Sequence, residues 1–168
     1  MSEVRRLTAE DAAAFHALRQ EAMTVDPDTL ATTLAEEQAK SLDYVAGMLV
    51  QNTVFGAFLD GELVGMAGFS RLKPMRERHK GMVWSMFVRR SARGHGFGGQ
   101  LLDQVIAHAR TEVEVLQLVV VSTNAPAVSL YESRGFQRWG LEPYALKLGE
   151  GRHTVDAYYW LPLADGLS

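Results

Sequence analysis

Apolar residues recur along this chain at two spacings, one typical of helices and the other of strands. Four segments have helical spacing: residues 12–23, about 28–40 with an irregular continuation to 49, the segment around 101–109, and about 125–134. The first follows the capping sequence Thr8-Ala9-Glu10-Asp11 and is stopped by Pro27, and the last is ended by Gly135. We therefore expect about four helices.

Strand-like runs lie between and after these helices. They cover residues 4–7, 53–59, 62–72, 82–88, 115–121, 136–147 and 154–163. Asp60-Gly61 joins two of them and is a dipeptide favoured by tight hairpins, and Gly149-Glu150-Gly151 joins the last two. The order predicts a single α+β domain over residues 1–168, with a mixed, mostly antiparallel central sheet of about seven strands flanked by about four helices.

Composition narrows the class of protein further. The chain has 168 residues, 47% of them apolar, and no cysteine, which excludes disulfides, thiolate metal sites and a cysteine nucleophile. The five histidines show neither an HExxH pattern nor paired spacing, so no metal site is expected. No signal-peptide pattern opens the sequence and no apolar run approaches the ~20 residues of a membrane span, which predicts a cytoplasmic protein without a membrane partner.

Charge is distributed unevenly around a net value of -3. Residues 1–62 carry many more acidic than basic side chains, whereas residues 63–93 contain Glu77 as their one acidic residue. The basic residues of that second segment are Arg71, Lys73, Arg76, Arg78, Lys80, Arg89, Arg90 and Arg93. One interpretation of this basic segment is a solvated loop, and the other is a binding site for a compact polyphosphate. No helix with clustered basic residues is present to read nucleic acid, so a nucleic-acid partner is not expected.

A glycine-rich turn, Arg93-Gly94-His95-Gly96-Phe97-Gly98-Gly99, follows the basic segment and precedes an amphipathic helix. Amides at a helix start lack intrahelical partners and can hold a phosphate, and glycine lets the anion approach. The turn ends in Gly99-Gln100 and not Gly-Lys-Ser/Thr, which excludes a P-loop. Its position in the middle of the chain also argues against a dinucleotide-binding fingerprint.

Two motifs resemble those of the GNAT N-acetyltransferase superfamily. The family's signature Gln/Arg-x-x-Gly-x-Gly/Ala is met by residues 93–98, after a strand that ends at Val88. Its second motif, Asn-x-x-Ala-x-x-Leu-Tyr-x-x-x-Gly-Phe, is met by Asn124, Ala127, Leu130, Tyr131, Gly135 and Phe136. The resemblance implies the acyl-CoA N-acyltransferase fold and acetyl transfer from acetyl-CoA to a primary amine by direct attack in a ternary complex. A non-catalytic acyl-CoA-binding module is the alternative.

The resemblance also implies a role for each matched position. The residues expected to contact acetyl-CoA are Met86, Phe87, Val88, Arg93, Gly94, His95, Gly96, Phe97, Gly98, Gly99, Asn124, Ala127 and Tyr131. Amides of residues 93–99 would bind the pyrophosphate, residues 86–88 would pair with the pantetheine arm, and Asn124 would hydrogen-bond that arm. Tyr131 is expected to be the general acid beside the thioester sulfur.

The general base is unassigned, because the strand over residues 82–88 contains no acid, where many family members have a glutamate. Presenting a lysine-like amine in its neutral form at pH 7 costs about 4.6 kcal/mol, so a proton acceptor is expected unless the acceptor amine is weakly basic. Glu77, His79 and Glu142 are the candidates. The acceptor itself is predicted only as a small-molecule or peptide amine, with a cation favoured by the acidic segment 1–62. The resemblance suggests a homodimer formed through the last strands.

Overall fold

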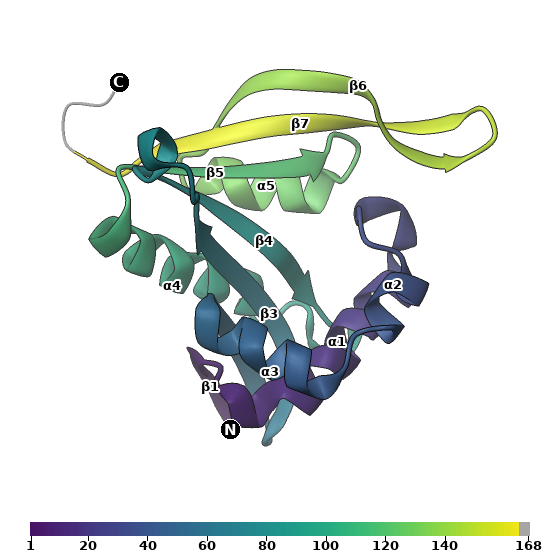
Figure 1. Cartoon of the computed structure of the whole chain (residues 1–168), viewed down its shortest axis with the longest axis vertical. Helices are drawn as coiled ribbons and strands as arrows, with labels where there is room; N and C mark the ends of the chain where they lie inside the picture. Colours follow the sequence, from purple (N-terminus) through teal and green to yellow (C-terminus); the bar gives the residue numbers. More distant parts are fainter. Residues whose placement is uncertain (165–168) are drawn as a thin grey trace. The chain divides into compact units, whose positions relative to one another are not determined.

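A computed structural model describes residues 1–164. The β-strands are β1 (Ser2–Arg6), β2 (Thr53–Leu59), β3 (Glu62–Arg71), β4 (Lys80–Val88), β5 (Val115–Val121), β6 (Gln137–Gly149) and β7 (Arg152–Pro162). The α-helices are α1 (Ala12–Val25), α2 (Leu34–Gln38), α3 (Leu42–Gln51), α4 (Phe97–Glu112) and α5 (Ala125–Ser133). The strands form one sheet in the order β1-β2-β3-β4-β5-β7-β6 (Figure 1). The predicted seven-stranded mixed sheet is confirmed.

The chain clusters into two compact units, each made of two segments. The first contains Met1–Ser70 and Trp84–His108, and the second contains Arg71–Val83 and the residues from Ala109 onward. The boundary passes through β4 and through α4, so each unit holds part of both elements. The prediction of a single domain over 1–168 stays a prediction.

The first unit is built on the antiparallel strands β1, β2 and β3. Asp60 and Gly61 both have positive φ, 50° and 83°, as a two-residue type I′ turn requires, and they close the β2–β3 hairpin as predicted. One face of these strands packs on α1 and α3 through a buried apolar cluster. That cluster contains Leu7, Ala12, Phe15, Leu18, Ala22, Val45, Leu49, Val54, Phe58, Leu63, Met66 and Phe87.

The second predicted helix, over about 28–40, is where the sequence analysis is least accurate. The helix begins only at Leu34 and stops at Gln38, and a separate helix follows from Leu42. Local capping explains the division: Thr33 and Glu36 form a capping box that starts α2, and the Ser41 hydroxyl accepts from the Tyr44 amide to start α3. Five α-helices therefore stand in the described chain, where about four were expected.

A close approach between strands occurs within the first unit at Gly68. A Cβ atom added there would lie 2.5 Å from the indole ring of Trp84 on β4, so the ring occupies the space that any side chain at position 68 would need. The Trp84 Nε1 donates to the Ser70 hydroxyl at 2.8 Å, which fixes the orientation of the ring. This packing holds the second half of β4 against β3.

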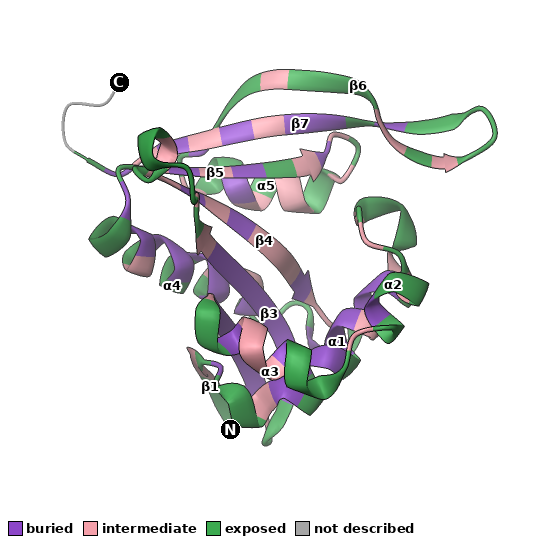
Figure 2. Cartoon of the chain, viewed as in Figure 1, coloured by how far each residue is buried: buried purple, intermediate pink, exposed green. Residues whose placement is uncertain are grey.

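The second unit contains the beginning of β4, the end of α4, and β5, α5, β6 and β7. Residues Lys80–Met82 pair with β5 in parallel, while β7 pairs antiparallel with β5 on one side and with β6 on the other. Strand β6 is exposed along most of its length, in contrast to β7 (Figure 2). In β5, Val119 is 40% exposed, so one face of the centre of this strand is open.

Candidate active site

The glycine-rich turn lies entirely in the first unit, immediately before α4. Gly94 and Gly96 have positive φ values of 83° and 78°, which β-branched or bulky residues adopt only with strain. A Cβ at Gly94 would meet no atom within 4 Å, so the turn faces open space there. The helix begins at Phe97, so Phe97, Gly98 and Gly99 belong to its first turn and not to the loop as the sequence analysis placed them.

Side chains of this turn are engaged with the protein itself. The Arg93 guanidinium donates to the Val88 carbonyl at 3.0 Å and to Asp26 at 3.3 Å, and lies over the Phe87 ring. The His95 ring hydrogen-bonds the Ala92 carbonyl through Nδ1 at 3.1 Å. Both side chains therefore shape the turn, and the groups it can offer to a ligand are mainly backbone amides.

The second half of β4 has an unusual backbone at Ser85. Its φ of 53° is left-handed, a conformation that is rare for residues other than glycine, asparagine and aspartate. The predicted pantetheine contacts Met86 and Val88 are half-buried, while the Phe87 side chain between them joins the core of the first unit. The ladder between β4 and β5 stops at Met82, before any of these three residues.

A buried ionic network beside Ser85 was not foreseen from the sequence. Glu37 of α2 is fully buried and accepts hydrogen bonds from Arg19 Nε at 2.9 Å and from Lys40 Nζ at 2.7 Å. The His16 ring bonds the Glu37 carbonyl, and Arg19 Nη1 donates to the Ser85 hydroxyl. Burial alone would raise the pKa of Glu37, but the hydrogen bonds from the two cations outweigh it and lower that pKa.

The motif residues Asn124, Ala127 and Tyr131 lie in the second unit, on and just before α5. The Asn124 side-chain oxygen accepts from the Ala127 amide at 3.4 Å, and the Asn124 amide donates to the Val121 carbonyl at 2.9 Å. Asn124 is thus the N-cap of α5, and Ala127 supplies the amide that it caps. A cofactor contact by either residue stays a prediction.

Tyr131 has its ring packed edge-on against Phe136, with 5.9 Å between centroids. The residue is 6% exposed, and burial raises the pKa of its hydroxyl. Among residues 1–164 no group hydrogen-bonds this hydroxyl, and no fully buried side-chain oxygen lacks a partner, so the Tyr131 oxygen is at least partly accessible. The side chain is a neutral donor held in a fixed position.

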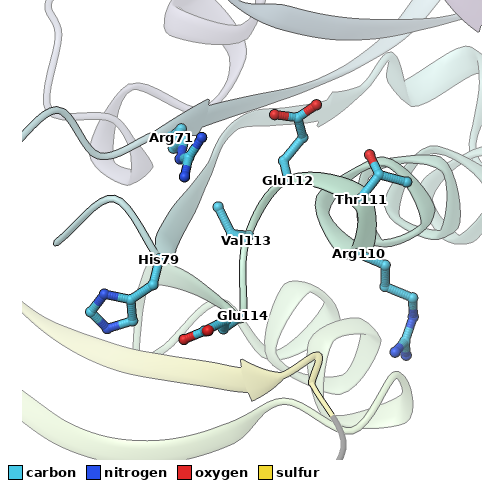
Figure 3. A pocket seen from close by; sticks show the side chains of 7 residues that line it. All are labelled: Arg71, His79, Arg110, Thr111, Glu112, Val113 and Glu114. Carbon is cyan, nitrogen blue, oxygen red and sulfur yellow. The ribbon is translucent and has the colours of Figure 1, made fainter. Parts of the chain in front are cut away.

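The three candidates for the general base all lie in the second unit, and none of their side chains is buried. Glu77 pairs with Lys80 at 3.5 Å, and the Glu142 carboxylate accepts from the Tyr158 hydroxyl. His79 lines a pocket of about 310 Å³ with Arg71, Arg110, Thr111, Glu112, Val113 and Glu114 (Figure 3). Basic and acidic side chains are mixed in that pocket, and it contains no residue predicted to contact acetyl-CoA.

Ion pairs neutralise much of the acidic charge in the first unit. Seven of the acidic residues in segment 1–62 have a cationic partner: Glu3, Asp11, Glu21, Asp26, Glu37, Asp60 and Glu62. Arg89, Arg90 and Arg93 of the basic segment are among the partners. Much of the charge that suggested a cationic acceptor is therefore neutralised locally, and that acceptor charge stays a prediction.

Neither a membrane-spanning helix nor a metal-binding cluster is found among the described residues. No helix among them is long and apolar enough to cross a membrane. No group of three or more histidine, aspartate or glutamate side chains in residues 1–164 is arranged to hold a metal ion.

Comparison with known proteins places the chain in a family. Over 84 residues it is 32% identical to the L-methionine sulfoximine/L-methionine sulfone acetyltransferase of Pseudomonas aeruginosa, covering 49% of each chain. Over 92 residues it is 40% identical to the N-alpha-acetyltransferase RimI of Mycobacterium tuberculosis, covering 54% of this chain and 55% of that protein. The chain thus spans about half the length of these curated relatives.

A solved structure shares the fold over nearly the whole length. A GNAT superfamily phosphinothricin acetyltransferase from Sinorhizobium meliloti, in complex with acetyl-CoA, superimposes with a TM-score of 0.82 at 21% identity, covering 98% of this chain and 90% of that one. The family model of the acetyltransferase (GNAT) family matches residues 13–136, which cross both units. The chain belongs to the GNAT acetyltransferase family.

Proposed function

We propose that this chain transfers an acetyl group from acetyl-CoA to the primary amine of a small molecule or peptide, by direct attack in a ternary complex. The observation that carries the proposal is the turn before α4. Gly94 and Gly96 both have positive φ there, and Gly94 faces open space, directly before the unpaired amides of a 16-residue helix. This turn, the cradle, offers a ligand backbone amides, which suit a pyrophosphate. The side chains of Arg93 and His95 are hydrogen-bonded to carbonyls of the protein and are not offered to the ligand.

Acetyl-CoA, when bound, supplies an acetyl thioester, and the chain supplies positioning and protons. The amides of residues 93–99 would hold the pyrophosphate, residues 86–88 would pair with the pantetheine arm, and Asn124 would bond that arm. Strand β4 leaves its ladder with β5 after Met82, which supports added-strand pairing beyond that point. An amide near Phe87 or Val88 would stabilise the oxyanion.

Tyr131 would give a proton to the departing sulfur. With ordinary pKa values, complete transfer from a phenol to a thiolate is uphill by about 2 kcal/mol, and burial of Tyr131 raises its pKa and widens that gap. Tyr131 therefore acts without accumulating as phenolate: it donates to the sulfur as it takes a proton from the attacking nitrogen. Its partly accessible oxygen supports this role.

The cradle is tested by a charge change at Gly96. Asn and Asp both tolerate the left-handed conformation and have the same shape, so Gly96→Asn and Gly96→Asp differ mainly by one negative charge. Calorimetric titration with acetyl-CoA should show at least a tenfold weaker affinity for the Asp variant than for the Asn variant, through repulsion of the pyrophosphate. Equal affinities would place the pyrophosphate elsewhere.

The role of Tyr131 is tested by Tyr131→Phe, with thiol release as the assay. Turnover should fall by about 10²-fold or more while acetyl-CoA affinity stays near wild type, because only the proton donor is removed. An unchanged turnover would remove Tyr131 from the mechanism.

The acceptor is found with a panel containing L-methionine sulfoximine, a peptide with a free amino terminus, and spermidine. Thiol release with at least one of these amines supports the proposal, and selective use of spermidine would support a cationic acceptor. The alternative, a non-catalytic acyl-CoA-binding module, predicts acetyl-CoA binding without thiol release. It is suggested by the absence of an acid on residues 82–88.

A further inference from the structure

Within residues 1–164, the carboxylates less than a tenth exposed belong to Glu37 and Asp156. Glu37 is surrounded by cations, as described above. Asp156, on β7 in the second unit, is 8% exposed and forms no ion pair within the described chain. Burying a carboxylate without a cation is costly, so such a group calls for a functional reason.

The partners of Asp156 define its orientation. The Thr154 hydroxyl donates to Asp156 Oδ1 at 2.9 Å and itself accepts the Leu146 amide of β6 at 3.0 Å. The Leu146 amide thereby fixes the hydroxyl as a donor to the carboxylate. No other residue in 1–164 hydrogen-bonds Oδ2, and no fully buried side-chain oxygen there lacks a partner, so this second oxygen is at least partly accessible.

Neighbouring strands bring no positive charge opposite Asp156. Its register partner on β6 is Glu142, whose carboxylate takes the Tyr158 hydroxyl, and its register partner on β5 is Val121. The titratable groups recorded around it are thus a second acid and a phenol. Nothing here competes with an incoming ammonium group for the Asp156 carboxylate.

Asp156 also lies beside the turn that contains Asn124. Val121, its partner on β5, accepts the Asn124 amide through its carbonyl, and the next residue, Ser122, donates to the Val155 carbonyl of β7. The strand segment that carries Asp156 is therefore hydrogen-bonded to the segment that leads into α5. Asn124 is the residue proposed to hold the pantetheine arm, which ends in the thioester.

We propose that Asp156 is the general base that the β4 strand lacks, and that its Oδ2 accepts a proton from the acceptor ammonium. This inference rests on the proposed function. Asp156 takes the first proton from the ammonium nitrogen. The neutral nitrogen then forms a bond to the acetyl carbon while the carbon–sulfur bond breaks. Its second proton passes through Tyr131 to the sulfur, and Asp156 returns its own proton to solvent.

The experiment compares Asp156→Asn with Glu132→Gln. Glu132 is an exposed carboxylate in the same unit that, like Asp156, accepts one hydroxyl hydrogen bond, from Tyr159 at 3.0 Å. Each variant is assayed with two acceptors: a peptide whose only amine is its amino terminus, with a pKa of about 7.7–8.0, and spermidine, whose amines are close to a lysine-like pKa of about 10.4. Acetyl-CoA affinity and melting temperature are measured in parallel.

We expect Asp156→Asn to lower kcat by 10²- to 10⁴-fold with spermidine. The factor should be smaller with the peptide, because fewer of the peptide molecules need deprotonation before they attack. If only one of the two amines is a substrate, Asp156→Asn should lower kcat with that amine and leave the acetyl-CoA affinity unchanged. The loss of kcat should become smaller as the pH rises. Glu132→Gln should stay within about threefold of wild type.

Three results would overturn the inference. One is wild-type turnover in Asp156→Asn. Another is a loss equal for both acceptors and at every pH, together with a lower melting temperature, which indicates a structural role. The third is a wild-type protein that neither binds acetyl-CoA nor releases thiol, and that result alone also removes the proposed function.

Discussion

The surroundings of Glu37 and Asp156 differ although both carboxylates are buried to a similar degree. Glu37 lies between Arg19 and Lys40, whereas Asp156 has one hydroxyl, an acidic neighbour and no cation. The first arrangement stabilises a charge where it is, and the second leaves a carboxylate without a cation. Burial of an acid is therefore not a functional signal by itself, and its partners decide between structure and chemistry.

The largest effect expected from this comparison is on folding stability. Glu37→Gln leaves Arg19 and Lys40 without their anion in a buried site, and should lower the free energy of unfolding by about 3–5 kcal/mol, measured by urea titration. Glu36→Gln is the neighbouring control, with an exposed carboxylate, and should have a much smaller effect. A loss for Glu37→Gln no larger than that of the control would show that the network contributes little to stability.

The next effect is on the pH dependence of stability. The pKa of Glu37 is lowered in the folded protein, so its contribution is complete above its ordinary pKa of about 4.3 and is lost as pH falls through the lower folded value. Urea midpoints measured between pH 7 and pH 3 should fall for the wild type and fall less steeply for Glu37→Gln. Parallel slopes for the two proteins would contradict the assignment. Asp11, whose pKa is lowered by Arg5, contributes to the slope that remains.

The smallest expected effect is that of Asp156→Asn on stability. The substitution removes a buried charge that has no cation and keeps an oxygen for the Thr154 hydroxyl, so the free energy of unfolding should change by at most about 1 kcal/mol. For a chain of this size that is a shift of about 2–4 °C in melting temperature. A decrease comparable to that of Glu37→Gln would make Asp156 a structural residue like Glu37.

Much of the fold was predictable because its signals are local. The Asp60-Gly61 hairpin, the Thr8 capping box of the 3-10 turn that leads into α1 and the Asn124 cap of α5 each depend on a few neighbouring residues, and all three are present. The division between α2 and α3 was missed because the capping signals at Thr33 and Ser41 were outweighed by apolar periodicity.

The two buried acids could not be identified from the sequence. Glu37 lies in the polar stretch Ala35-Glu36-Glu37-Gln38, which is typical of a solvated helix face, and its burial depends on Arg19 from another helix. Asp156 interrupts a strand where an acid is usually exposed, and its burial depends on residues of β6 and β7 that come together only after the hairpin folds. Long-range packing decides both environments.

The contact between Trp84 and Gly68 gives the protein an optical probe of its own. The chain has three tryptophans, and replacing Trp139 and Trp160 with phenylalanine leaves the indole on β4 as the single source of tryptophan fluorescence. That ring packs against Gly68. Trp84 itself lies two residues before Met86, where the strand segment proposed to receive the pantetheine arm begins. We therefore expect the emission of Trp84 to change when a ligand pairs with β4, which gives a spectroscopic measure of binding at that strand.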